Sequence, residues 1–179
     1  MSLSPQPDET IEPSPVETPF AAAFDAERDL SITRIIRAPR AIVWRAWTDP
    51  DRLARWWIPA PMTARVERLE LVPGGALITS MSEDGRAFEP HMNAVSVTVE
   101  ASRRIVFTNA LDAQWRPAAP APVAVTAEFT LTDHPEGTAY RATARHASAD
   151  VRARHEELGF VDGWTMVTAA LAALVEREV

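Results

Sequence analysis

The C-terminal segment, residues 149–179, places the strongest constraint on what this chain can fold into. Its large apolar residues recur at alternating spacings of four and three, and they are Phe160, Trp164, Val167, Leu171 and Leu174. This spacing predicts one α-helix over residues 149–179 with a single apolar face. Burial of each such side chain contributes roughly 1.5–3 kcal/mol, so the helix needs an apolar surface to cover.

The chain upstream supplies that surface as a series of short strands. Segments rich in β-branched residues, or alternating between apolar and polar residues, predict strands over 30–37, 63–72, 76–82, 91–100, 104–109, 123–131 and 138–146. Two short helices are expected after the first strand, because Pro39 suits a first helical turn and Asp49-Pro50 caps a second one. The predicted fold class is α+β, a curved antiparallel sheet of about seven strands wrapped around one long helix. A single helix cannot fill the concave face of such a sheet, so we expect a cavity.

Strand parity selects the polar side chains that would reach this cavity. On 91–100, His91 and Asn93 share the parity of the three valines and are expected to point inward with them. Tyr140 and His146 are expected to point inward from the last strand, and Asn109 from the end of the 104–109 strand. Buried polar groups need partners, so this set is the best candidate for a site. The alternative is that each histidine ends a strand and is bonded to backbone.

Composition bounds the domain count and excludes several partners. The 179 residues, 46% of them hydrophobic, suffice for one core, and we expect a Pro-rich acidic arm over 1–29 followed by one domain over 30–179. Seven acids against one arginine place −6 of the net charge of −7 in that arm, so the domain is near neutral. No basic run offers a nucleic acid its phosphate contacts. The chain has no cysteine, which excludes thiol chemistry.

A cytoplasmic location is expected, without membrane association, because no apolar run approaches the roughly 18 residues that span a bilayer. We expect neither a cofactor nor a metal. His155-Glu156 begins like a zinc-protease helix, but Gly159 stands where that motif needs its second histidine. The arm and an exposed sheet edge both offer contact surface for a homodimer.

Four motifs, taken in order, resemble a known family. They are residues 37–50 (RAPRAIVWRAWTDP), residues 54–57 (ARWW), Pro73-Gly74-Gly75, and residues 155–160 (HEELGF) followed by Gly163-Trp164. This series is similar to the activator-of-heat-shock-protein-ATPase homologues, within the START-like (SRPBCC) superfamily. The resemblance covers about residues 30–178 and implies a β-α-α-β6-α helix-grip fold with a deep apolar cavity. It is not specific for a function, since members include ligand binders and cyclase-like and hydrolase-like proteins.

The expected lining of that cavity combines aromatic residues with the inward polar groups. It consists of Trp56, Trp57, His91, Asn93, Phe107, Asn109, Phe129, Tyr140, His146, Phe160, Trp164 and Val167. Tryptophan provides a large apolar face and one N–H donor, although each tryptophan could equally pack the core.

Three functions follow from this pattern. The leading hypothesis is binding of a small apolar or aromatic metabolite. The second is a cyclase- or hydrolase-like enzyme in the same pocket, with His91 or His146 moving protons. The third, from the family name, is stimulation of a heat-shock ATPase.

Overall fold

A seven-stranded antiparallel sheet forms the body of the protein in the computed structural model, which describes residues 23–119 and 122–179. The strands are β1 (Asp29–Ile36), β2 (Thr63–Leu69), β3 (Ala76–Ser82), β4 (Glu89–Glu100), β5 (Arg104–Thr108), β6 (Thr126–His134) and β7 (Gly137–Arg145). They lie in the order β1-β7-β6-β5-β4-β3-β2, so the first and last strands of the chain pair with each other. The helices α1 (Arg40–Thr48), α2 (Pro50–Leu53), α3 (Ala149–Glu157), α4 (Phe160–Val175) and η1 (Glu176–Glu178) complete the fold.

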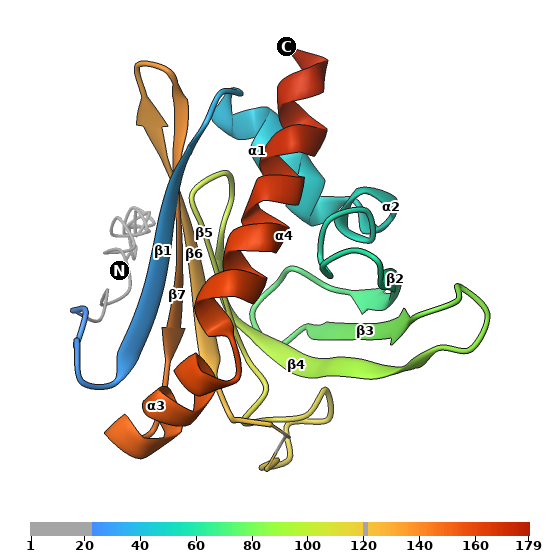
Figure 1. Cartoon of the computed structure of the whole chain (residues 1–179), viewed down its shortest axis with the longest axis vertical. Coiled ribbons are helices and arrows are strands. Elements are labelled where there is room, and N and C mark those ends of the chain that lie inside the picture. Colours follow the sequence, from blue (N-terminus) through green and yellow to red (C-terminus); the bar gives the residue numbers. More distant parts are fainter. Residues whose placement is uncertain (1–22, 120–121) are drawn as a thin grey trace, which may run out of the picture.

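The layers of the fold confirm the predicted α+β helix-grip architecture. Helix α4 lies across the concave side of the sheet, and α1 and α2 cover the neighbouring part of that side (Figure 1). Phe160, Leu171 and Val175 are buried on the inner side of α4, while Trp164 and Val167 are partly buried against the core. The apolar stripe therefore faces the sheet as its spacing predicted.

The predicted long C-terminal helix is present as α4, but it does not run unbroken over 149–179, because the chain bends by 64° between α3 and α4. Gly159 has a φ of +91° and ends α3, in a left-handed conformation that glycine adopts without a steric cost. Glycine can also mark a close approach of a helix to a sheet, and Gly159 and Gly163 are the two glycines of this segment. A Cβ built on either glycine meets no atom within 4 Å, so neither glycine marks a close approach.

A cluster of tryptophans joins the two short helices to the sheet. Asp49 separates the helices and accepts hydrogen bonds from the backbone N–H groups of Asp51 and Arg52, which begins α2. Trp47, on α1, packs its ring 4.8 Å from that of Trp56 and 4.5 Å from that of Phe129 on β6. Trp47 thus connects α1 both to β6 and to the segment after α2 that carries Trp56.

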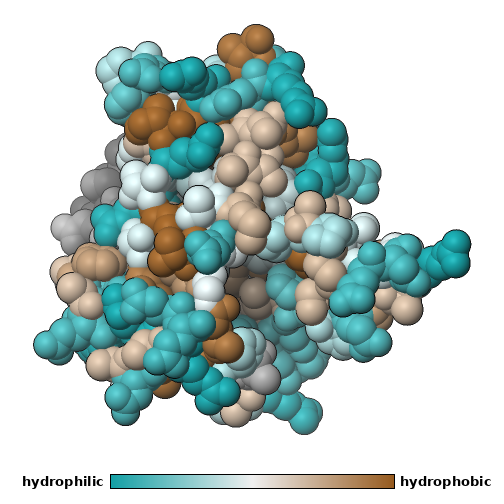
Figure 2. Space-filling view, in the orientation of Figure 1, coloured by the Kyte–Doolittle hydropathy of each residue, from teal (hydrophilic) through white to brown (hydrophobic). Residues whose placement is uncertain are grey.

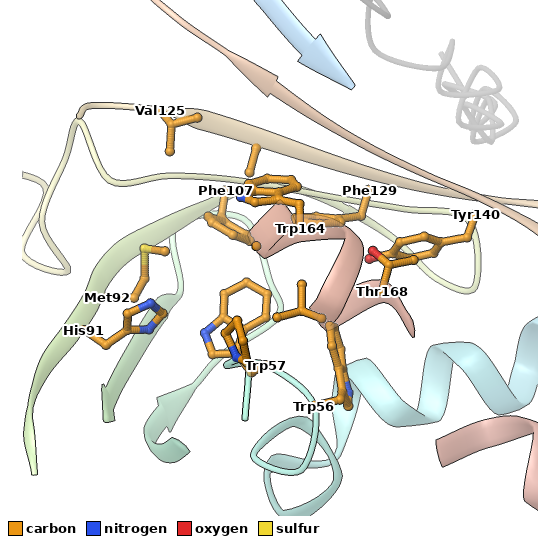
Figure 3. Close-up of a pocket in the computed structure, with 14 residues that line it drawn as sticks. Trp56, Trp57, His91, Met92, Phe107, Val125, Phe129, Tyr140, Trp164 and Thr168 are labelled. Carbon is orange, nitrogen blue, oxygen red and sulfur yellow. The ribbon is translucent and has the colours of Figure 1, made fainter. Parts of the chain in front are cut away.

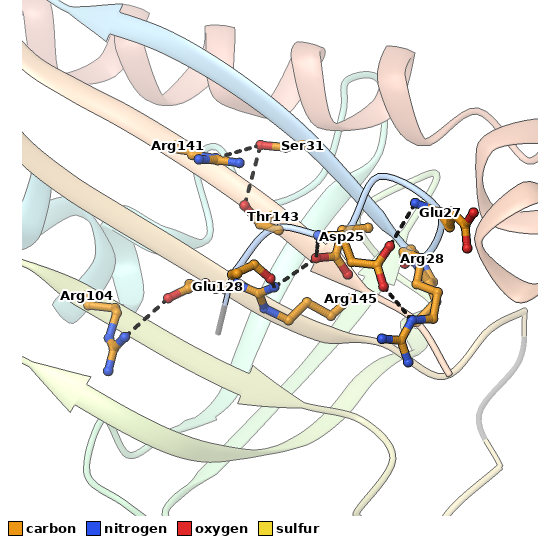
Figure 4. Close-up of polar contacts among 12 residues, drawn as sticks. Asp25, Glu27, Arg28, Ser31, Arg104, Glu128, Arg141, Thr143 and Arg145 are labelled. Atoms are coloured by element: carbon orange, nitrogen blue, oxygen red, sulfur yellow. Dashed lines mark hydrogen bonds and ion pairs between the residues drawn. The ribbon is translucent and has the colours of Figure 1, made fainter. Parts of the chain in front are cut away.

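The convex side of the sheet carries a network of ion pairs (Figure 4). Arg145 lies 2.8 Å from Asp29 and 2.6 Å from Glu128, joining β7 to strands on both sides of it. Arg104 on β5 lies 2.7 Å from Glu100 and 3.4 Å from Glu128. Polar residues are paired on this side, so the apolar residues of the same strands face α4.

Most of the expected arm over 1–29 lies outside the described residues, and the domain division at residue 30 stays a prediction. Strand β1 begins at Asp29, whose backbone N–H donates to the carbonyl of Asp25 at 2.7 Å. Among the described residues, no single helix is long and apolar enough to cross a membrane. The pair formed by α3 and the helix after it has the required length and composition only when both are counted together, and the two are bent by 64° at their junction.

Replacing Trp56 by Phe should lower the free energy of unfolding by about 2–4 kcal/mol, because Trp56 is 1% exposed and its indole Nε1 donates to the Ala46 carbonyl at 3.1 Å. Trp115→Phe is the matched control, since Trp115 also donates to a backbone carbonyl, that of Gly74, but is 66% exposed. Its cost should stay below about 1.5 kcal/mol. Urea denaturation measures both changes, and equal losses would contradict the central place of Trp56 in the core.

Candidate functional site

A cavity of about 170 Å³ lies between α4, the concave side of the sheet and the segment that follows α2. The space-filling view shows the surface hollowed beside α4, on the side facing β3 and β4 (Figure 2). Fourteen residues line the cavity: Trp56, Trp57, Pro59, His91, Met92, Phe107, Val125, Ala127, Phe129, Tyr140, Gly163, Trp164, Val167 and Thr168. The helix and the sheet therefore leave a space the size of a small molecule.

Aromatic rings form the walls of this cavity (Figure 3). Phe129 and Trp164 lie nearly parallel, with an interplanar angle of 9° and centroids 5.5 Å apart. Phe107 stacks on Phe129 at 5.6 Å, and Trp57 presents its ring edgewise to Phe107 at 5.9 Å. Flat walls of this kind favour a planar guest, because aromatic pairs gain energy from offset and edge-to-face contacts.

Eight of the residues expected from the sequence line the cavity, and six further residues join them. Val125 and Ala127 continue the inward parity of Phe129 along the chain, and Thr168 lies one helical turn after Trp164. These three could have been named from periodicity alone. Pro59, Met92 and Gly163 carried no such signal.

A β-bulge places His91 at the cavity. Met92 pairs with Thr79 and Pro90 pairs with Ser80, so His91 is an extra residue on β4, and both His91 and Met92 line the cavity. The expected parity of β4 is therefore wrong: Ala94 is fully buried in the core, whereas Val97 is 48% exposed.

His91 is held in its neutral form. Its Nδ1 lies 3.0 Å from the Thr79 hydroxyl, and burial against the cavity lowers the pKa of its imidazole. As a whole residue His91 is exposed, which places it at the edge of the cavity rather than inside it.

The two asparagines expected in the cavity hold a loop instead. Asn109 accepts a hydrogen bond from the Val125 N–H at 2.7 Å and donates to the Val123 carbonyl at 3.3 Å. Asn93 accepts from the Ala113 N–H at 2.9 Å. Both side chains satisfy backbone groups of the chain between β5 and β6, so neither lines the cavity.

His146 and Phe160 lie beyond the cavity, where β7 meets α3. His146 donates from Nδ1 to the Arg28 carbonyl at 2.8 Å, so its Nε2 accepts from Nδ1 of His155, also at 2.8 Å. The ring of His155 packs edgewise on Phe160 with centroids 5.0 Å apart. This histidine pair attaches α3, which has no buried residue of its own, to the sheet. The alternative of a strand-end histidine bonded to backbone is the one the structure shows for His146.

The histidine pair should make stability fall in mild acid. Burial, and then the nearby His146, lower the pKa of His155 from 6.5 to about 4. The unfolded chain therefore takes up a proton at His155 more readily than the folded chain, and stability is lost as the pH falls from 6.5 towards 4. Urea midpoints at pH 7 and pH 5 measure this loss. In His155→Asn, whose amide keeps a donor near the Nδ1 position, the midpoint should depend less on pH; an unchanged pH dependence would exclude His155 as its source.

Tyr140 is the most deeply buried polar group of the cavity lining. Its side chain is 1% exposed, and burial raises the pKa of its phenol well above 10, so the hydroxyl keeps its proton. The indole N–H of Trp47 opposes this shift, although it does not reach the geometry of a full hydrogen bond. No carboxylate or arginine stands among the fourteen lining residues. The cavity is therefore electrically neutral and mostly apolar.

Among residues 23–119 and 122–179, no group of three or more histidine, aspartate or glutamate side chains is placed to hold a metal ion. The polar groups of the lining that could take part in proton transfer are His91 and Tyr140. They come from strands at different ends of the cavity in Figure 3.

The fold and the cavity define a START-like helix-grip protein. Residues 37–176 match the family described as Activator of Hsp90 ATPase homolog 1-like protein, and the chain belongs to this family. No curated protein matches the chain.

Several solved structures share the fold. A protein from Nitrosomonas europaea is 35% identical, with a TM-score of 0.75 over 87% of this chain and 98% of its own. A protein from Mycobacterium smegmatis is 26% identical, with a TM-score of 0.68 over 83% and 91%. An AHSA1-like protein from Aeromonas hydrophila is 24% identical, with a TM-score of 0.61 over 84% and 93%, and it bears on the fold alone.

Proposed function

We propose that this protein binds a small apolar or aromatic metabolite in the cavity beneath α4. One observation carries the proposal: stacked and edgewise aromatic rings line a neutral space of about 170 Å³ that the side chains leave unfilled. For comparison, an apolar cavity of about 150 Å³ admits benzene. A bound guest would recover the dispersion contacts that the empty walls lack.

An enzymatic role in the same cavity has less support. Acid–base catalysis needs a pair of polar groups within about 2.6–3.2 Å of the reacting atoms. His146 is bonded to the Arg28 carbonyl and to His155, outside the cavity, and His91 faces Thr79 at its edge. The polar groups expected to converge are thus dispersed, which favours binding over catalysis.

The family description refers to stimulation of the Hsp90 ATPase. For this chain that activity, a homodimer and a cytoplasmic location all stay proposals, and the geometry of the cavity bears on none of them.

Toluene binding tests the proposal, because toluene matches the cavity in size and carries no polar group. At ten times its Kd it should add about 1.4 kcal/mol to the stability and raise Tm by about 3–6 °C. Val167→Phe places a ring in the space and should abolish the Tm shift, since Val167 lines the cavity.

Val161→Phe is the matched control for this test. It makes the same change on the same helix at a residue that is 49% exposed, so the toluene shift should persist. If toluene gave no shift with the parent protein, or gave the same shift with Val167→Phe, the cavity would not be the binding site.

A further inference from the structure

The charge of the lining restricts what the cavity can hold. None of the fourteen lining residues is arginine, aspartate or glutamate, and His91 is neutral. Moving an ionised group from water into such a space without a counter-charge costs several kcal/mol. The guest is therefore uncharged.

The size of the cavity restricts the guest further. A space of about 170 Å³ is close to the roughly 150 Å³ that accommodates benzene. It therefore suits one ring with a short substituent. The rings of Phe107, Phe129 and Trp164 set the plane in which that ring stacks.

Within the described residues, two polar groups of the lining are left for the guest: the indole N–H of Trp57, which is buried without a hydrogen-bond partner, and the hydroxyl of Tyr140. Figure 3 shows the hydroxyl of Tyr140 extending from β7 towards Thr168 on α4, at the end of the cavity away from His91. Tyr140 is 1% exposed, and the Trp47 indole N–H faces the oxygen of its hydroxyl, so the hydroxyl proton is left without an acceptor among the hydrogen bonds of the described residues. A buried O–H group that donates to no acceptor costs free energy, and it recovers that cost when it donates to a ligand.

We propose that the guest is an uncharged, single-ring aromatic compound whose oxygen accepts a hydrogen bond from the Tyr140 hydroxyl. This ligand class rests on the proposed function of the cavity. Tyr140 is then the residue that selects an aromatic ketone, aldehyde or ether over the plain hydrocarbon, and the absence of a cation in the lining rejects the aromatic acid.

Two probes of the same shape test the role of Tyr140. Acetophenone carries a carbonyl oxygen, and α-methylstyrene carries a CH₂ group in its place. Titration calorimetry with the parent protein and with Tyr140→Phe gives four dissociation constants, from which the coupling between hydroxyl and carbonyl follows. Tyr140→Phe should weaken acetophenone about 3- to 10-fold and leave α-methylstyrene unchanged or tighter. Benzoate should bind at least about 100-fold more weakly than acetophenone.

The outcomes separate the ligand class from the function. If α-methylstyrene and acetophenone both fail to bind, the cavity does not take apolar guests and the proposed function is lost. If both bind but Tyr140→Phe changes them equally, or benzoate binds as tightly as acetophenone, the function stands and the ligand class is wrong. Circular dichroism and the Tm of Tyr140→Phe establish that the variant is folded.

Discussion

The rest of the structure depends on the contacts that the ring of Phe129 makes. It packs against Trp47 from α1, Phe107 from β5, Tyr140 from β7 and Trp164 from α4, so each layer of the fold meets at one side chain on β6. Aromatic rings are rigid and prefer particular angles to one another. They therefore hold the layers at a fixed separation without filling the space between them. The cavity is the space left between the layers at this separation, and the same rings form its walls.

Much of the fold was predictable because it follows from short-range rules. Proline and glycine mark the turns, alternation marks the inward residues of β6 and β7, and the spacing of Phe160, Leu171 and their neighbours marks the face of α4. These signals are local, and the residues that carry them pack where a helix laid on a sheet requires. Trp164 and Phe129 could therefore be assigned to a cavity wall from sequence alone.

The predictions that were wrong concern features that depend on more than one strand or on a single backbone angle. Gly159 ends α3 through a left-handed conformation, and the helical spacing on either side of it gives no sign of the bend. The bulge at His91 arises from the pairing of β4 with β3, which reverses the expected parity. Asn109 and His146 were correctly expected to be buried, but their partners are backbone groups that only the tertiary fold brings near. The burial of a polar side chain alone thus does not show whether it serves a binding site or makes a structural hydrogen bond.

The account claims that a cavity walled by aromatic rings accepts a guest, and a crystal structure of the protein equilibrated with bromobenzene tests this most directly. The anomalous signal of bromine reports position without reliance on a fitted ring. The account predicts one strong peak between Phe107, Phe129 and Trp164, with the surrounding rings in place. A structure in which these rings close the space, with bromine absent from it, would contradict the claim.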